Sequence, residues 1–205
     1  MSSSKKLVIF DLDGVLVDAC EWHREALNEA LQEVSNTSIN QEEHVSIFNG
    51  IPTRKKLSIL VDQKRVRTED IEKIYTLKQD KTIEIIKEKA VKRKEKIDLI
   101  DSLKKEGMTV ACFTNSIRET AHLMLQKTGI FDLFEIVVTN QDVTSPKPDP
   151  EGYISVMKHF DKEPGETVIV EDSPKGVQAA KSSGAKVVIV KNPDEVNLDL
   201  VERIL

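Results

Sequence analysis

The stretch Asp11-Leu12-Asp13-Gly14-Val15-Leu16-Val17-Asp18 decides the fold, because it directly follows a short apolar run near the start of the 205-residue chain. That run, residues 6–10, is predicted to be a buried parallel strand. Two acids at positions i and i+2 of a tight turn can face one cavity, and Gly14 permits the backbone conformation that such a turn needs. Open α/β sheets bind ligands at the carboxyl ends of their strands, so Asp11 and Asp13 are candidate site residues. Taken alone, two acids in a turn are more often ordinary turn chemistry.

The rest of the chain alternates between strand and helix patterns. Further short apolar runs, most of them rich in β-branched residues, predict strands over residues 109–113, 135–138, 167–170 and 186–190. Helical patterns are expected over residues 117–128, 150–160 and 174–183, with Gly129 and Gly184 at the positions of C-cap glycines. This alternation predicts an α/β fold with a Rossmann-like parallel sheet and helices on both faces.

A long helical stretch separates the first strand from the second. Apolar side chains recur at helical spacing over residues 20–34, and residues 68–89 begin with Thr68 as an expected N-cap. A further helix, residues 97–106, is expected to lead into the second strand. We therefore predict an α/β core domain formed by residues 1–16 and 91–205, and an inserted all-helical cap domain formed by residues 17–90.

Composition narrows the class of protein. The hydrophobic share is 39% and the charged share 32%, as expected for a globular protein. No apolar run approaches the ~20 residues of a membrane span, and the first apolar run is too short for a signal peptide. We expect a cytoplasmic monomer without a membrane partner. The net charge of −5 argues against a nucleic-acid partner, although residues 54–96 carry a net charge of +7, interpreted as solvated helix surface. Cys20 and Cys112 lack a metal-binding spacing and are expected to be structural thiols.

Polar residues follow the later predicted strands as well. They form the segments Thr114-Asn115-Ser116, Lys147-Pro148-Asp149-Pro150 and Glu171-Asp172-Ser173. Carboxylates from two strands can hold Mg²⁺, which prefers hard oxygen ligands. A hydroxyl, an amide and a lysine can bind a phosphate group. Chance explains each segment separately, but it explains the ordered set poorly.

Together with Asp11–Asp18, and with the continuation Pro174-Lys175-Gly176-Val177-Gln178-Ala179-Ala180, these segments resemble the motifs of the haloacid dehalogenase-like superfamily. The resemblance covers nearly the whole chain, and the motifs stand in the family's order. An insert just after the first motif is typical of the subfamily with a small helical cap. That subfamily includes sugar-phosphate phosphatases, phosphoglycolate phosphatase, β-phosphoglucomutase and phosphonatase.

The resemblance implies a role for each motif residue. Asp11 is expected to attack phosphorus and form an aspartyl-phosphate, and Asp13 to act as general acid and then general base. The Mg²⁺ ion is expected to be held by the Asp11 carboxylate, the Asp13 backbone carbonyl and Asp172, with Glu171 bound directly or through water. The phosphoryl oxygens are expected to be bound by Thr114, Asn115 and Lys147.

Other candidates have equally good structural explanations. Asp18 either guards the site entrance, as the resemblance suggests, or caps the following helix. His23 stands where cap-bearing relatives often have a histidine, and an ordinary helix histidine is equally expected. Gly50 and Arg54 belong to a segment that resembles the cap loop of relatives, so Arg54 either contacts the substrate or is exposed to solvent.

The sequence therefore predicts a phosphatase that uses Mg²⁺ and acts on a small phosphorylated metabolite, such as a sugar phosphate. Dehalogenases lack the second aspartate of the first motif, so Asp13 argues against dehalogenation. The first motif also differs from that of a phosphonatase. A β-phosphoglucomutase-like phosphotransferase stays open, because its cap loop carries an arginine one position away from that of Arg54. A catalytically silent binding module is the remaining alternative, and the intact motifs argue against it.

Overall fold

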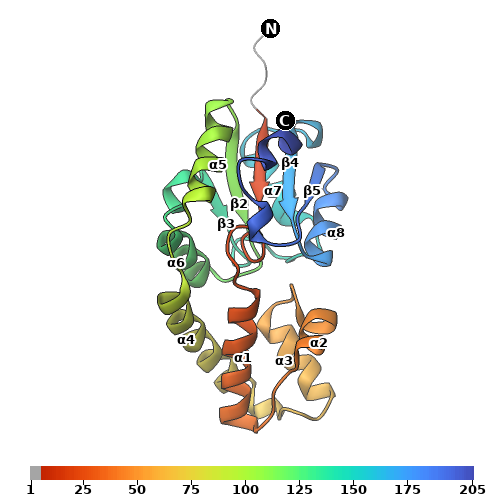
Figure 1. Ribbon diagram of the computed structural model, residues 1–205. Helices are drawn as coiled ribbons and strands as arrows, with labels where there is room; N and C mark the ends of the chain where they lie inside the picture. The colour runs from red at the N-terminus through yellow and green to blue at the C-terminus, as the bar shows by residue number, and fades with distance from the viewer. Residues whose placement is uncertain (1–5) are drawn as a thin grey trace. The chain divides into compact units, whose positions relative to one another are not determined.

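The computed structural model describes residues 6–205, which form two compact units. The first unit consists of residues 6–18 and 91–205, and the second of residues 19–90. Figure 1 shows the strands gathered in the first unit, whereas the second unit is helical. Among the described residues, no helix is both long enough and apolar enough to cross a bilayer.

The first unit is built on a parallel sheet, which confirms the predicted α/β class. The strands in chain order are β1 (Leu7–Phe10), β2 (Thr109–Phe113), β3 (Ile136–Val138), β4 (Thr167–Glu171) and β5 (Lys186–Ile189). Within the described residues they form one five-stranded sheet in the order β3-β2-β1-β4-β5, and every neighbouring pair is parallel. Because β1 lies between β2 and β4, the residues that follow these three strands share one edge of the sheet.

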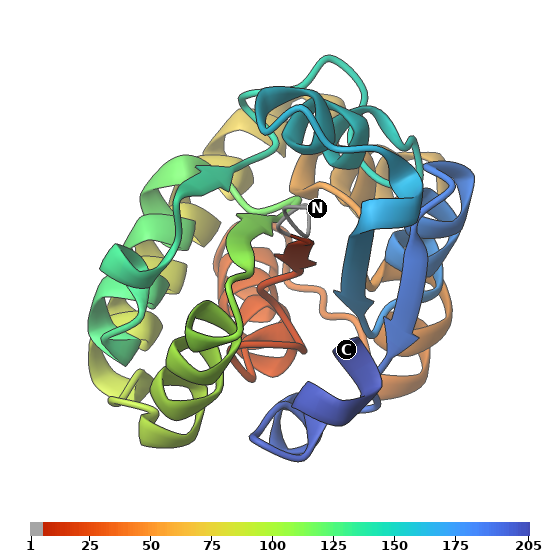
Figure 2. The ribbon, with the colours of Figure 1, turned by 90° about the horizontal axis from the view of Figure 1, so that it is seen from above.

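Helices cover both faces of this sheet. They are α5 (Lys94–Lys105), α6 (Arg118–Thr128), α7 (Glu151–His159), α8 (Pro174–Ser182) and α9 (Leu200–Ile204), joined by the 3₁₀ segments η3 (Phe131–Leu133), η4 (Pro164–Glu166) and η5 (Pro193–Glu195). Side chains of α7 and α8 pack with Leu7 and Ile9 of β1 in one apolar cluster. In Figure 2, α5 and α9 lie on the opposite side of the sheet from α7. Since β1 is buried on both faces, all four of its residues are apolar.

The second unit packs its helices around an apolar core of its own. Its elements are α1 (Cys20–Ser35), α2 (Gln41–Glu43), the π-helical segment η1 (His44–Phe48), α3 (Thr53–Asp62), the 3₁₀ segment η2 (Thr68–Asp70) and α4 (Ile71–Lys89). Leu27 and Leu31 of α1, Leu57 of α3 and Ile74 of α4 share one buried cluster. The short α2 was not predicted individually, although Asn40 and Glu43 form a capping box that a local sequence signal could have revealed.

Several predicted helix starts are wrong. The Thr68 side chain does not cap α4; Thr68 opens the 3₁₀ segment η2, and α4 begins only at Ile71. The Arg67 guanidinium pairs with Asp70 at 2.8 Å and holds this 3₁₀ turn. Asp18 is not the N-cap of α1 either, because that position is Ala19 and no side chain caps the helix. Of the two predicted C-cap glycines, Gly129 ends α6 with a φ of 76°, in the left-handed region that favours glycine. The C-cap of α8 is Ser183, and the predicted Gly184 follows it with a φ of 83°.

Candidate active site

Lys147 is a buried cation at the carboxyl edge of the sheet. Its Nζ donates to Asp11 Oδ1 at 2.5 Å, to Glu171 Oε1 at 2.7 Å and to the Phe113 carbonyl at 3.0 Å. These acceptors belong to the ends of β1, β4 and β2, the three adjacent strands in the centre of the sheet. The ammonium group therefore connects the residues that end these strands.

Asn115 fixes the loop that carries Lys147. Its side-chain oxygen accepts the Lys147 backbone N–H at 3.0 Å, and its amide nitrogen donates to the Lys147 carbonyl at 3.2 Å. Bonds in both directions define the side-chain amide orientation and the position of the loop. Asn115 thus positions Lys147, while its predicted contact with phosphate stays a prediction.

Asp13 has partners of another kind. Its Oδ2 accepts hydrogen bonds from the Thr114 hydroxyl at 3.1 Å and the Ser116 hydroxyl at 2.8 Å. Asp11 and Asp13 are only two residues apart, yet one carboxylate accepts from an ammonium and the other from two neutral hydroxyls. Ser116 belongs to a quoted motif but was not predicted as a site residue. The predicted binding of phosphate by Thr114 stays a prediction.

Glu171 is enclosed by hydrogen-bond donors. Its Oε1 accepts from Lys147 and from the Tyr153 hydroxyl at 2.8 Å, and its Oε2 accepts from the Asp172 N–H at 3.0 Å and the Ser173 N–H at 3.2 Å. The Ser173 hydroxyl donates to Oε2 as well, at 3.3 Å. A carboxylate offers about four lone-pair sites. The lone pairs of Glu171 are therefore largely used by the protein itself.

Asp172 differs from Glu171 in this respect. Its Oδ1 is buried and has no hydrogen-bond partner among the described residues. Gly14 lies directly against the carboxylate, because a Cβ at this position would collide with Asp172, and its φ of 89° also favours glycine. The pKa of Asp172 is raised to about 7, first by burial and then by the neighbouring charges of Glu171 and Asp13. A buried, unpartnered carboxylate oxygen is costly unless a cation or a proton binds it.

In the described part of the chain, the acidic side chains of this site outnumber the lysine that pairs with them. Ligand atoms of Asp11, Glu171 and Asp172 all lie within 4.8 Å of one another. Burial raises the pKa of Asp11 well above its ordinary value; Lys147 opposes this shift, and Glu171 and Asp172 add to it. Burial lowers the pKa of Lys147, but the carboxylates of Asp11 and Glu171 outweigh it and raise the pKa overall. The excess of negative charge and the unpartnered oxygen of Asp172 fit a hard divalent cation.

Sequence reasoning missed Tyr153, which is fully buried in α7 and reaches Glu171 with its hydroxyl. Its ring packs edge-on against Phe113, with the ring centroids 4.9 Å apart. The Lys147 Nζ lies 4.8 Å from the Phe113 ring centroid and 4.9 Å from that of Tyr153. Two aromatic faces thus line the ammonium, where its charge is stabilised by the rings. A tyrosine within a helical pattern gives no local sign of such a role.

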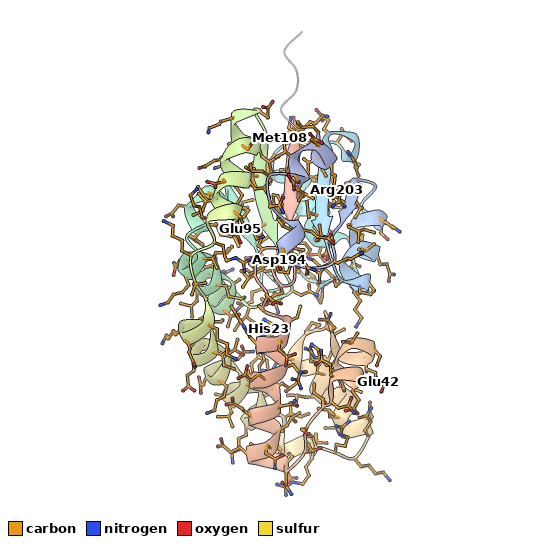
Figure 3. All side chains as sticks on the ribbon, viewed as in Figure 1. His23, Glu42, Glu95, Met108, Asp194 and Arg203 are labelled. Carbon is orange, nitrogen blue, oxygen red and sulfur yellow. The ribbon has the colours of Figure 1, made fainter. Side chains whose placement is uncertain are left out.

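The remaining predicted residues have their own surroundings. Asp18 is exposed at the end of its segment of the first unit. In the second unit, His23 lies on α1 (Figure 3), and its Nδ1 is 3.2 Å from Lys78 Nζ. Gly50 has a φ of 71°. Arg54 pairs with Glu72 and stacks 4.2 Å from the Tyr75 ring centroid, and its side chain is 56% exposed. Their predicted contacts with substrate stay predictions.

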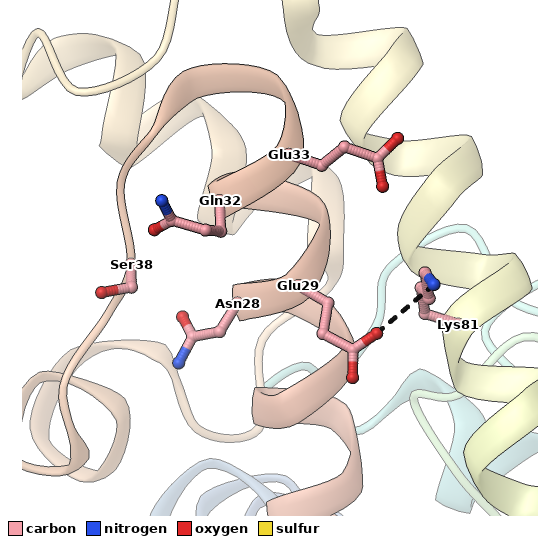
Figure 4. A pocket seen from close by; sticks show the side chains of 6 residues that line it. All are labelled: Asn28, Glu29, Gln32, Glu33, Ser38 and Lys81. Carbon is pink, nitrogen blue, oxygen red and sulfur yellow. Dashed lines mark ion pairs between the residues drawn. The ribbon is translucent and has the colours of Figure 1, made fainter.

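The second unit also has an open pocket, shown in Figure 4. It is lined by Asn28, Glu29, Gln32, Glu33, Ser38 and Lys81. Asn28 is already bonded in both directions to the backbone of Ile39, and Glu29 is paired with Lys81 at 3.5 Å. These contacts connect α1 to the chain that follows it and to α4. We therefore interpret the residues that line the pocket as structural.

Comparison with known proteins identifies the family. The sequence pattern of the haloacid dehalogenase-like hydrolase family matches residues 8–190 of this chain. A phosphorylated carbohydrates phosphatase of Thermotoga maritima is 29% identical over 86% of this chain and 81% of its own length. The pyrophosphatase PpaX of Bacillus velezensis is 30% identical over 87% of this chain and 80% of its own length.

Solved structures show the same fold. A β-phosphoglucomutase of Clostridium difficile superposes with a TM-score of 0.83 at 19% identity, covering 98% of this chain and 96% of the other. CbbY of Rhodobacter sphaeroides, bound to xylulose 1,5-bisphosphate, has a TM-score of 0.80 at 22% identity, covering 91% and 86%. The chain therefore belongs to the haloacid dehalogenase-like hydrolases, as its four motifs predicted, and to the phosphoric monoester hydrolases among them.

Proposed function

We propose that this phosphatase uses Mg²⁺ and hydrolyses a small phosphorylated metabolite through an aspartyl-phosphate on Asp11. One observation carries the proposal: Asp11 and Asp13 have separate partners at the same edge of the sheet. Asp11 is bonded to the buried Lys147 ammonium, whereas Asp13 accepts hydroxyl hydrogen bonds from Thr114 and Ser116. Two carboxylates in different surroundings suit a nucleophile and a general acid–base.

The reaction divides into two displacements. In the first, an Asp11 oxygen forms a bond to phosphorus, the bond between phosphorus and the ester oxygen breaks, and Asp13 gives its proton to the leaving alkoxide. In the second, Asp13 takes a proton from water as the water oxygen bonds to phosphorus. The bond between phosphorus and Asp11 then breaks, which releases inorganic phosphate and restores the Asp11 carboxylate. Lys147 stabilises the negative charge of the phosphoryl group throughout.

Asp11 and Asp172 are the side chains that fit a bound Mg²⁺ best, together with the Asp13 backbone carbonyl. Asp172 has a buried oxygen without a partner, and Asp11 lies within 4.8 Å of it. Glu171 suits a contact through water, because its own oxygens already accept five protein donors. When bound, the ion supplies positive charge that offsets the repulsion between the Asp11 carboxylate and an anionic phosphate ester.

The names of the similar proteins indicate the substrate class only in general terms. The similar proteins include phosphatases named for phosphorylated carbohydrates, phosphoglycolate and validoxylamine A 7′-phosphate. A small phosphorylated metabolite is the common property of these names. We further propose that the second unit serves as the cap that selects the organic group.

Replacement of the nucleophile tests the proposal. Asp11→Asn is expected to reduce hydrolysis of an aryl phosphate to background, because an amide cannot form the aspartyl-phosphate. Asp132→Asn is the matched control, since Asp132 lies in η3, before β3 and away from the carboxyl edge. Removal of Mg²⁺ by a chelator is expected to stop turnover, and added Mg²⁺ to restore it. Full activity in Asp11→Asn overturns the nucleophile assignment, and activity that survives chelation overturns the metal dependence.

A screen of phosphorylated metabolites with Mg²⁺ would then narrow the substrate class. It should include β-glucose 1-phosphate, whose conversion to glucose 6-phosphate would indicate a mutase. Release of inorganic phosphate from other esters, without isomerisation, is the outcome that we expect. Asp11→Asn accompanies every substrate as the control for contaminating phosphatases.

A further inference from the structure

Tyr153 is the buried residue whose contacts reach the proposed catalytic groups without reaching the reacting atoms. Its hydroxyl donates to Glu171 Oε1 at 2.8 Å, and that same oxygen accepts from Lys147 at 2.7 Å. Tyr153 and Glu171 are both 0% exposed. The phenol, the carboxylate and the ammonium thus form one connected set beneath Asp11.

Glu171 needs this second donor to keep a single orientation. Its Oε2 is fixed by the backbone of Asp172 and Ser173, at the start of α8. Among the residues that the structure describes, the donors to the Oε1 atom are Lys147 and Tyr153. Without the phenol, Lys147 alone would define the direction of this oxygen, and Lys147 is also drawn toward Asp11 and the Phe113 carbonyl.

The aromatic ring of Tyr153 restricts Lys147 from another side. The ring lies 4.9 Å from the Lys147 Nζ and packs against Phe113. One residue therefore acts on Lys147 twice, through its hydroxyl by way of Glu171 and through its ring directly. A phenylalanine at position 153 would preserve the ring and remove only the hydroxyl.

We propose that Tyr153 is a positioning residue for phosphoryl transfer: its hydroxyl holds Glu171 so that the Lys147 ammonium stays directed at the phosphoryl group bound beside Asp11. This inference rests on the proposed function and adds to it a residue that contacts neither substrate nor metal. Tyr153 acts through Glu171 and Lys147, and its effect appears in the stabilisation of the transition state.

The test compares Tyr153→Phe with Thr128→Val. Thr128 is a buried residue of α6 whose hydroxyl donates to the Met124 carbonyl at 2.7 Å, so this control loses a buried hydroxyl away from the site. With Mg²⁺ present, Tyr153→Phe is expected to lower kcat for an aryl phosphate about tenfold, the loss typical of a hydrogen bond to a charged group. The KM is expected to change less than about twofold, because charge develops mainly in the transition state.

Binding of orthovanadate, measured by calorimetry, separates positioning from stability. The dissociation constant is expected to rise about tenfold in Tyr153→Phe, because vanadate resembles the transition state, and to stay unchanged in Thr128→Val. A destabilised but correctly positioned site would lower the number of binding sites and leave the constant unchanged, and that result overturns the proposal. A wild-type chain that hydrolyses no aryl phosphate overturns the proposed function, and this inference with it.

Should Tyr153→Phe fail to fold, the same hydrogen bond is tested with 3-fluorotyrosine in a Tyr75→Phe background. The more acidic phenol would bind Glu171 more strongly and weaken the hold of Glu171 on Lys147. A change of the vanadate constant of at least about twofold is expected, whereas an identical constant overturns the proposal.

Discussion

Lys147 and Lys96 are two buried lysines of the same unit with opposite electrostatic surroundings. Lys147 is 4% exposed and faces the carboxylates of Asp11 and Glu171. Lys96 is 0% exposed, and its Nζ donates to the backbone carbonyls of Pro193 and Val196. Both side chains lose the solvation of bulk water, so the difference between them comes from their partners.

The two pKa values differ accordingly. The pKa of Lys96 is lowered to about 8, first by burial and then by the nearby Arg93 charge, while Glu95 and Asp194 oppose the shift. At Lys147, burial acts in the same direction, but Asp11 and Glu171 raise the pKa above its ordinary value. Carboxylates keep Lys147 cationic, as its proposed contact with an anionic phosphoryl group requires. Carbonyl groups make Lys96 a structural connection between α5 and the segment that begins at η5.

The largest expected effect is the loss of activity in Lys147→Met. Removal of one charge-stabilising donor from a phosphoryl site is expected to lower kcat/KM about 10²- to 10³-fold. Lys96→Met is the matched control, because it replaces a second buried lysine of the same unit by the same residue, and the Lys96 Nζ donates to the carbonyls of Pro193 and Val196 rather than to the carboxylates around Lys147. Its kcat/KM is expected to remain within about twofold of wild type, since ordinary substitutions away from a site act mainly on stability.

Activity must be normalised to the folded fraction, measured by circular dichroism. Lys96→Met leaves two carbonyls without their donor, which is expected to cost about 1–3 kcal/mol of the free energy of unfolding. Equal losses of normalised activity in the two variants would contradict the assignment of Lys147 to the site. Equal losses of stability alone would not, because both side chains are buried.

The sequence revealed the role of one of these two lysines and not that of the other. The strand at residues 109–113 was predicted with the bounds that the structure has, because a short β-branched run between turns has few alternatives. Lys147 was found because its motif follows a strand in the order typical of the family. Lys96, by contrast, stands in a charged run that resembles solvated helix surface. Its acceptors are 97 and 100 residues away in the chain, and no local pattern reveals such a pairing.

Tyr153 and Asp18 illustrate the same limit at the candidate site. Tyr153 donates to a residue 18 positions later, and this contact depends on the packing of α7 against the sheet. Asp18 seemed equally suited to capping a helix, but the helix begins one residue later, after Ala19. Helix ends are set by competition among a few local hydrogen bonds of similar strength, which the sequence resolves poorly.

The second expected effect is an unusual dependence of stability on alkaline pH. The pKa of Lys96 is about 8 in the folded chain and about 10.4 in an unfolded one. Between these values the unfolded chain binds the proton and the folded chain does not, so the free energy of unfolding rises with pH. The free energy of unfolding of the wild type should rise by about 3 kcal/mol relative to that of Lys96→Met between pH 8 and pH 10.5.

Urea unfolding of both chains across this pH range provides the measurement. Other groups also titrate there, but they are shared by the two chains and cancel in the difference. A difference that is flat with pH would contradict the low pKa of Lys96. A difference that falls as pH rises would mean that Lys96 is stabilised as a cation, as Lys147 is.

The smallest effect is expected from Glu95, a carboxylate near Lys96. Glu95 Oε1 lies 3.9 Å from the Lys96 Nζ, and its side chain is 40% exposed; Figure 3 shows Glu95 and Asp194 in this region. Glu95→Gln should lower the pKa of Lys96 further, so that the alkaline gain in stability begins at a lower pH. At pH 7 the loss should be no more than about 1 kcal/mol, because a half-exposed ion pair is screened by solvent.

Asp98→Asn is the control for Glu95→Gln, since Asp98 is also on α5 but pairs with the exposed Lys94 at 3.1 Å. Urea unfolding at pH 7 and at pH 9 should separate the two variants mainly at the lower pH, because Lys96 is mostly charged at pH 7 and mostly neutral at pH 9. A loss of several kcal/mol in Glu95→Gln would mean that Lys96 depends on a carboxylate as strongly as Lys147 does. In that case both lysines would depend on carboxylate partners, and only the exposure of those partners would differ. Burial of Lys96 among carbonyl groups alone would then not explain its low pKa.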